Sequence, residues 1–153
     1  MYWEEKIDRL KKDTDPNDFK VPFTDWSTIL KKIEDKFVIK ENSDYSDFVF
    51  SNWDSRLKEK RQIKKILTVN IAGECDKFDS NQNYWVVLTR DKADFKNLVY
   101  DSKPTVMKTL IGLWGGDFYI VDKKYNWLTY FKRDDTDTEV FKSGDLVTPL
   151  DKK

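Results

Sequence analysis

The sequence predicts an α+β fold, with N-terminal helices packed on a mainly antiparallel sheet and a β-β-α-β-β arrangement in the C-terminal half. Apolar residues recur at intervals of three and four in the first 37 residues, which is the spacing of amphipathic helices. After residue 83, short aromatic and β-branched runs alternate with turn residues, which is typical of strands and hairpins. Because no repeat or linker divides the 153 residues, we expect one domain over 1–153.

Two helices are expected before residue 40. The first covers residues 3–12 and is followed by turn residues at 13–18. The second begins near Thr24 or Asp25, which are favoured N-cap residue types. Their apolar faces comprise Trp3, Ile7 and Leu10 in the first helix and Trp26, Ile29, Leu30, Ile33 and Phe37 in the second.

Residues 37–82 give the least decisive pattern. A brief strand fits residues 37–39, and residues 45–57 suit either a helix or a strand because their apolar residues fit both periods. Residues 56–65 hold six basic residues and one acid and lead into apolar residues, so we predict a short basic amphipathic helix there. A polar loop is expected at 76–83.

The C-terminal half is better defined by hairpin and helix signals. A helix is expected to begin at Pro104, which the first helical turn accepts, and to end at the glycine pair Gly115-Gly116. Two hairpins flank this helix. The strands are expected at residues 84–88, 95–100, 118–121, 127–131 and, as an additional edge strand, 138–141.

The composition excludes several kinds of chemistry. The chain has no His and a single Cys, so it cannot form a Ser-His-Asp triad, a His-ligated zinc site, an intrachain disulfide or a cysteine metal cluster. No cofactor and no metal are therefore expected. Cys75 lies between Glu74 and Asp76, whose negative charges disfavour its thiolate, so we do not expect a nucleophilic role.

The N-terminus and the lack of a long apolar run indicate a cytoplasmic protein, and the charge balance indicates a protein with a partner. The N-terminus lacks the basic and apolar regions of a signal peptide, and no apolar run reaches the length of about 18 residues that a membrane span needs. Lys and Arg number 28, as do Asp and Glu, so the net charge is zero. A neutral chain has little colloidal repulsion, which suits a protein that binds a partner or forms a homo-oligomer.

Two charged runs are candidate binding sites. Each is also explained by ordinary solvated surface, and the acidic run lacks the spacing of a calcium loop. The basic run lies just after Phe50 and Trp53, and basic residues near aromatics are used by proteins that bind single-stranded nucleic acid. The basic run comprises Arg56, Lys58, Lys60, Arg61, Lys64 and Lys65, and the acidic run comprises Asp134, Asp135, Asp137 and Glu139.

Aromatic residues favour a binding module over a catalyst. The chain has 6 Trp, 7 Tyr and 10 Phe, more than a core of this size needs, so some rings are expected at the surface, where Trp and Tyr form protein-binding hot spots. A nucleic-acid-binding protein that uses residues 56–65 is the first alternative. A His-free hydrolase or carbohydrate-binding protein, which would need converging carboxylates in a cleft, is the second.

The run from Asp117 to Leu128, DFYIVDKKYNWL, resembles a family of small, largely uncharacterised bacterial proteins thought to be similar to immunity proteins. The resemblance covers residues 83–131 and includes NYW at 83–85. It implies a protein that neutralises a bacterial toxin by binding it directly. Relatives often carry a histidine after the Trp-Leu pair, whereas residues 129–135 contain none.

The resemblance also suggests where a partner would bind. A nuclease toxin would present a basic site, so we expect the acidic run at residues 134–139 to form an electrostatic rim. Trp114 and Tyr130 are the candidate aromatic anchors beside it.

Overall fold

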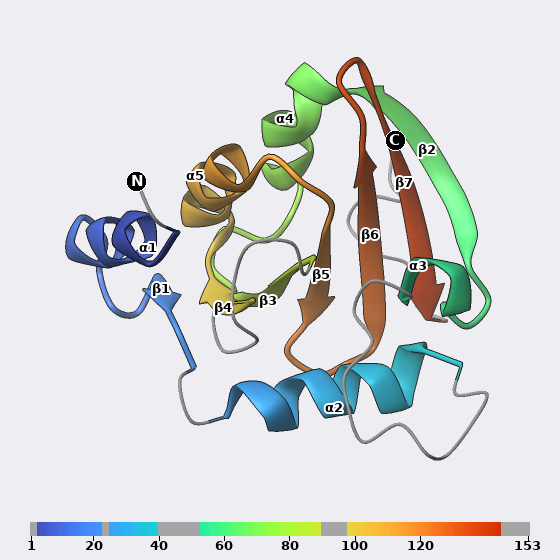
Figure 1. Cartoon of the computed structure of the whole chain (residues 1–153), viewed down its shortest axis with the longest axis horizontal. Coiled ribbons are helices and arrows are strands. Elements are labelled where there is room, and N and C mark those ends of the chain that lie inside the picture. The colour runs from blue at the N-terminus through green and yellow to red at the C-terminus, as the bar shows by residue number, and fades with distance from the viewer. Residues whose placement is uncertain (1–2, 23–24, 40–52, 90–97, 145–153) are drawn as a thin grey trace.

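The computed structural model describes residues 3–22, 25–39, 53–89 and 98–144. Within these residues, helices and one seven-stranded antiparallel sheet form an α+β fold, as the sequence predicts. Figure 1 shows α2 across the foot of the sheet, α1 and α5 on one side, and β2 as the outermost strand on the other side.

The helices and strands have the following bounds. The helices are α1 (Trp3–Lys12), α2 (Trp26–Phe37), α3 (Trp53–Arg56), α4 (Ile71–Cys75) and α5 (Pro104–Trp114), and a 3-10 turn, η2 (Thr68–Asn70), precedes α4. The strands are β1 (Phe19–Lys20), β2 (Arg61–Leu67), β3 (Tyr84–Leu88), β4 (Val99–Ser102), β5 (Phe118–Asp122), β6 (Trp127–Arg133) and β7 (Asp137–Gly144).

The three longest helices lie where the apolar spacing predicts them. Helix α1 buries Ile7 and Leu10, and α2 buries its expected apolar face apart from the half-buried Trp26. Helix α5 has Pro104 in its first turn and ends at Gly115, whose φ of 77° lies in the left-handed region that glycine adopts without strain. Among the described residues, no helix has both the length and the apolar composition needed to cross a bilayer.

The strand order of the sheet is β1-β4-β3-β5-β6-β7-β2. Strands β3 and β4, helix α5, and strands β5 and β6 follow one another along the chain, which confirms the predicted β-β-α-β-β arrangement. In the β5–β6 hairpin, Tyr119 lies opposite Tyr130 and Val121 lies opposite Leu128. Part of the strand predicted at 95–100 lies outside the described residues.

Both faces of the central strands are buried, and each is rich in aromatic rings. On the face that we call the tyrosine face, Tyr119 stacks on Tyr130 at 4.6 Å between ring centroids, and Tyr130 stacks on Phe141 at 5.9 Å. On the opposite face, the phenylalanine face, Phe118 stacks on Phe131 at 4.6 Å. Two buried faces need more aromatic residues than one, which accounts for much of the aromatic content.

The expectation of exposed aromatic rings is not met within the described residues. All aromatic side chains there are buried or half-buried. The exposed large apolar side chains are aliphatic, and they are Ile39, Leu67, Val69 and Leu113.

The predicted basic helix at residues 56–65 is wrong. Helix α3 ends at Arg56, and residues 61–67 form β2, which pairs antiparallel with β7. Its β-branched Ile63 and Ile66 are half-buried against the core, while Lys65 is exposed. Helical spacing of the basic residues suggested a helix, but a short isolated helix is only marginally stable. Pairing with β7 stabilises the strand through backbone hydrogen bonds instead.

The remaining expectations for the middle and the end of the chain are met in part. The brief strand at 37–39 is a single bridge between Val38 and Leu57, and most of the undecided segment 45–57 lies outside the described residues. The strand predicted at 138–141 exists within β7, but it lies inside the sheet between β6 and β2 and is not an edge.

Candidate functional site

The two charged runs lie side by side on the strand pair β2–β7. Lys65 lies opposite Glu139 and Leu67 lies opposite Asp137, while on the other side of β7 Lys132 of β6 is also opposite Glu139. Figure 1 shows this pair at the outer edge of the sheet. The sequence suggested nucleic acid as the partner of the basic run and a protein as the partner of the acidic run. In the fold, the two runs form one surface of mixed charge, here called the β2–β7 surface.

Most basic side chains of this surface have partners within the fold. The Lys64 amine lies 3.1 Å from the Glu74 carboxylate of α4, and the Lys65 amine lies 3.7 Å from the Asp137 carboxylate. Lys60 pairs with Asp54 and lies 4.3 Å from the ring centroid of Phe141. Lys58 donates to the Asp35 carbonyl, and Arg61 donates to the Gly144 carbonyl. Arg56 is half-buried in α3. Fewer basic side chains are therefore free to bind phosphate groups than the six that the sequence contains in this run.

A hollow of about 360 Å³ lies beside the β6–β7 turn, at one end of the β2–β7 surface. Asp134 and Asp135 are exposed there, and the Thr68 hydroxyl donates to the Asp134 carbonyl, which joins the end of β2 to the turn. The hollow is lined by Thr68, Gly112, Gly115, Arg133, Asp134 and Asp135. Two of the four predicted acids therefore border one concave site, whereas Asp137 and Glu139 lie along β7.

Arg133 lines this hollow and belongs to the phenylalanine face. Its guanidinium donates to the Ile111 carbonyl near the C-terminal end of α5 at 3.1 Å and lies 5.7 Å from the ring centroid of Phe118. Its Nε is buried without a hydrogen-bond partner among the described residues. Burial lowers the pKa of Arg133, and the Asp117 carboxylate opposes that change.

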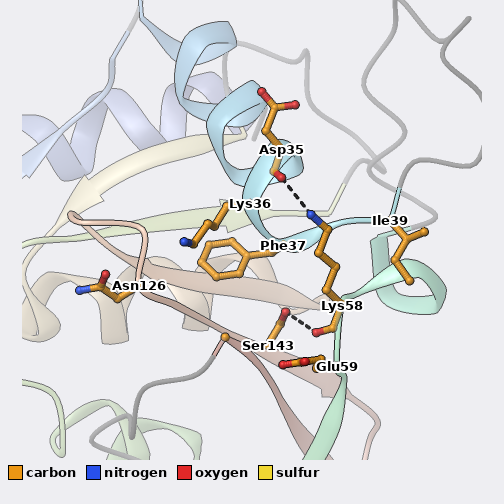
Figure 2. Close-up of a pocket in the computed structure, with 9 residues that line it drawn as sticks. Asp35, Lys36, Phe37, Ile39, Lys58, Glu59, Asn126 and Ser143 are labelled. Carbon is orange, nitrogen blue, oxygen red and sulfur yellow. Dashed lines mark hydrogen bonds between the residues drawn. The ribbon is translucent and has the colours of Figure 1, made fainter.

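A cleft of about 840 Å³ lies at the other end of the same strand pair. Figure 2 shows Phe37 between the side chains of Lys36 and Lys58, with Glu59 and Ser143 below them. The Lys58 amine donates to the Asp35 carbonyl at 3.1 Å, and the Ser143 hydroxyl donates to the Lys58 carbonyl at 2.6 Å. The cleft is lined by Asp35, Lys36, Phe37, Ile39, Lys58, Glu59, Asn126, Ser143 and Gly144.

This cleft combines charged side chains with an exposed apolar residue. Acidic and basic side chains surround apolar Phe37 and Ile39, of which Phe37 is 1% exposed and Ile39 is 47% exposed. The one hydroxyl in the cleft, that of Ser143, is 1% exposed and gives its proton to a backbone carbonyl, so no base among these residues activates it. Such a site can hold a polypeptide through charge pairs and apolar contacts.

Cys75 lies in the core near α5. Burial, with a smaller contribution from Asp76, raises the pKa of its thiol to about 12. The thiol is therefore protonated at neutral pH, and burial dominates over the neighbouring charges that the sequence suggested as the cause. Within the described ranges, no group of three or more Cys, Asp or Glu side chains is placed to hold a metal ion.

Neither of the two expected aromatic anchors is fully exposed for contact with a partner. Tyr130 is 2% exposed and donates its hydroxyl proton to the Asp117 carboxylate at 2.8 Å, so it is not the surface anchor that the sequence suggested. Trp114 is half-buried at the end of α5, where it packs edge-on against Trp3 at 5.3 Å and donates to the Asp117 carbonyl. Both residues hold α5 and the sheet together.

Sequence reasoning missed two exposed aliphatic side chains beside the charged runs. Leu67 is 51% exposed at the end of β2, and Val69 is 84% exposed in the following turn. In the sequence they belong to the apolar run 66–71, so they resemble core residues. Period-two alternation could have distinguished Leu67 from core residues. In a strand, Leu67 lies on the opposite face from its neighbour Ile66, which is half-buried.

The fold and this surface define a small α+β protein with a charged sheet edge. The profile of a family of unknown function, DUF6756, matches residues 5–146, and the chain belongs to this family. No curated protein and no solved structure matches the chain.

Proposed function

We propose that this protein acts by binding another protein, as an immunity-type inhibitor that neutralises a bacterial toxin. The observation that carries the proposal is the β2–β7 surface, where exposed charges of both signs adjoin two exposed aliphatic residues, Leu67 and Val69. Exposed aliphatic side chains bordered by charged ones suit a protein interface, because burying them supplies free energy and the charges select the partner.

The toxin assignment depends on the resemblance of the run from Asp117 to Leu128 to immunity-like proteins. In the fold, this run forms the β5–β6 hairpin, and Phe118, Tyr119, Ile120 and Val121 are buried in it. The resembling segment therefore supports a common scaffold. The surface that would recognise a particular toxin is formed by other residues, along the β2–β7 surface and the β6–β7 turn.

Nucleic-acid binding has less support from the same surface. Affinity for nucleic acid depends on several Lys or Arg side chains that neutralise phosphates. Here Lys60, Lys64 and Lys65 each face a carboxylate of the protein itself, and Glu139 lies between two lysines. A phosphate backbone needs several of these lysines at once, so it would have to displace the partners of all three, including the more buried Lys64–Glu74 pair.

Co-purification with the product of the adjacent gene tests the proposed function. The tagged protein is expressed with its neighbour, and a stable complex that abolishes the neighbour's toxicity supports the proposal. The exposed pair Asp134 and Asp135 is then changed to lysine, and we expect affinity to fall by about tenfold or more.

A matched control changes two exposed acids on α1, Glu5→Lys and Asp8→Lys; α1 lies at the left of the view in Figure 1, and the β6–β7 turn lies at the top. This control has the same charge change and should bind as the parent protein does. If no neighbouring gene encodes a toxin and pull-downs recover no protein partner, the proposed function is wrong.

A further inference from the structure

We infer that the outer edge of β2 is the docking element of this protein and that it binds an extended acidic segment of the partner as an eighth strand of the sheet. This inference rests on the proposed function, because it says how the protein partner is held. It also makes a separate claim about chemistry, since it assigns backbone groups, side-chain charges and an orientation to the contact.

The first step concerns the backbone of β2. This strand ends the sheet order and pairs only with β7 among the described residues. The Thr68 N–H donates to the Thr136 carbonyl at 2.8 Å. Because hydrogen-bonded residues alternate along an antiparallel pair, Ile66 and Lys64 direct their peptide groups at β7, and Lys65 and Leu67 direct theirs away from it. Among the described residues, the backbone donors and acceptors of Lys65 and Leu67 at this edge have no partner.

The second step concerns the length of the open edge. The register shifts between Gln62 and Lys64, so Ile63 is an extra residue that interrupts regular pairing at one end. The 3-10 turn Thr68–Asn70 ends the strand at the other end. A regular edge of Lys64–Leu67 remains, which matches the short strands that bind by edge addition.

The third step concerns which segment fits this edge. A second copy of the chain would place β2 antiparallel to β2, with lysine near lysine across the new pair, and like charges opposite each other destabilise a sheet. Edge lysines are a device that prevents such self-pairing. An acidic strand has the opposite effect, because its carboxylates would lie beside Lys65 and near the exposed Arg61.

The fourth step concerns competition within the fold. Lys65 already faces Asp137, but their atoms are 3.7 Å apart and the two side chains are 59% and 44% exposed. An exposed pair of this kind is weak. A partner carboxylate can therefore replace Asp137 at Lys65, while the exposed Leu67, on the same face two residues further, gains an apolar contact.

A peptide titration tests the docking mode directly. The probe is the synthetic peptide acetyl-TVEVEVT-amide, and acetyl-TVKVKVT-amide is the comparison of opposite charge. Binding is followed by amide chemical shifts of the isotope-labelled protein. We expect the acidic peptide to bind at least about tenfold more tightly, and we expect the largest shifts at the amides of Lys65 and Leu67.

Two variants separate the backbone contact from the charge. Lys65→Pro removes an N–H that points away from β7, so it should leave the β2–β7 pairing and the melting temperature close to those of the parent protein while it lowers affinity for the acidic peptide by about tenfold. Lys65→Thr keeps the N–H and removes the charge, so its affinity should lie between the two. Circular dichroism confirms that each variant is folded.

The outcomes distinguish this inference from the proposed function. Equal binding of both peptides, or equal binding to the parent and a folded Lys65→Pro variant, overturns the docking mode, and so does self-association through the same two amides. A toxin complex that Lys65→Pro leaves unchanged also overturns the mode but keeps the function. Acidic-peptide binding without any toxin partner overturns the function and keeps the mode.

Discussion

Replacing Gly144 with alanine is expected to destabilise the fold by about 2–6 kcal/mol. Gly144 ends β7 opposite Trp127, and its φ of 112° is a conformation that residues with a Cβ rarely adopt. A Cβ added there would lie 2.6 Å from the Asn126 carbonyl oxygen and 3.0 Å from the Trp127 Cα. Both atoms belong to the backbone, so no side-chain rotation relieves the contact.

The magnitude follows from two terms. Holding a residue with a Cβ at this φ costs about 1–3 kcal/mol. Moving the start of β6 away from the new methyl group disturbs the β6–β7 pairing and costs a further 1–3 kcal/mol or so. Since a loss of 1 kcal/mol lowers the melting temperature of a domain of this size by about 2–4 °C, the melting temperature should fall by about 4–24 °C.

Urea unfolding followed by tryptophan fluorescence and circular dichroism measures this effect. The matched control is Gly112→Ala, because Gly112 lies inside α5 and a Cβ there meets nothing within 4 Å. That change should stabilise the protein by about 0.5–1 kcal/mol, since alanine favours the helix. If Gly144→Ala is as stable as the parent protein within about 0.5 kcal/mol, the steric argument is wrong.

Three further predictions concern buried and paired groups. Tyr130→Phe should lower the free energy of unfolding by about 1–2 kcal/mol, because Asp117 loses a hydrogen-bond donor; an unchanged urea midpoint would contradict this. Cys75, with a thiol pKa of about 12, should react with a thiol reagent at pH 8 only after unfolding, and rapid labelling of the native protein would refute its burial. The bond to Glu74 raises the pKa of Lys77, so its stabilisation should be complete below the ordinary lysine pKa of 10.5 and be lost as the pH rises through the higher folded value. Alkaline unfolding of Glu74→Gln should lack that pH dependence, and an identical pH profile in the two proteins would reject the assignment.

The sequence predicted best those elements whose signals are local. Apolar spacing found α1, α2 and α5, and the first turn at Pro104 and the glycine at 115 bounded α5 within a residue. The hairpin of β5 and β6 was recognised because aromatic and β-branched runs flank a polar turn. Helix capping and turn chemistry act within a few residues, so these features need no knowledge of the rest of the fold.

The elements that were missed depend on residues far away in the chain. β2 is a strand because β7, which lies at residues 137–144, pairs with it, and its lysines at helical spacing conceal the alternation of Ile66 and Leu67. The candidate site was affected in the same way. Both charged runs were found, but their meeting on one surface follows from that distant pairing. The burial of Tyr130 could not be inferred because an exposed and a covered sheet face have the same alternation.

The strand order also bears on how the protein folds during its synthesis on the ribosome. The consecutive segment from β3 to β7 forms the middle of the sheet, and the earlier strands β1 and β2 close its two outer sides. β1 and β2 therefore leave the exit tunnel before the strands that pair with them, β4 and β7, have been made, and β2 waits longer because β7 is the last strand. During that interval, positive charge on the waiting strand keeps nascent chains on neighbouring ribosomes of a polysome from pairing with one another.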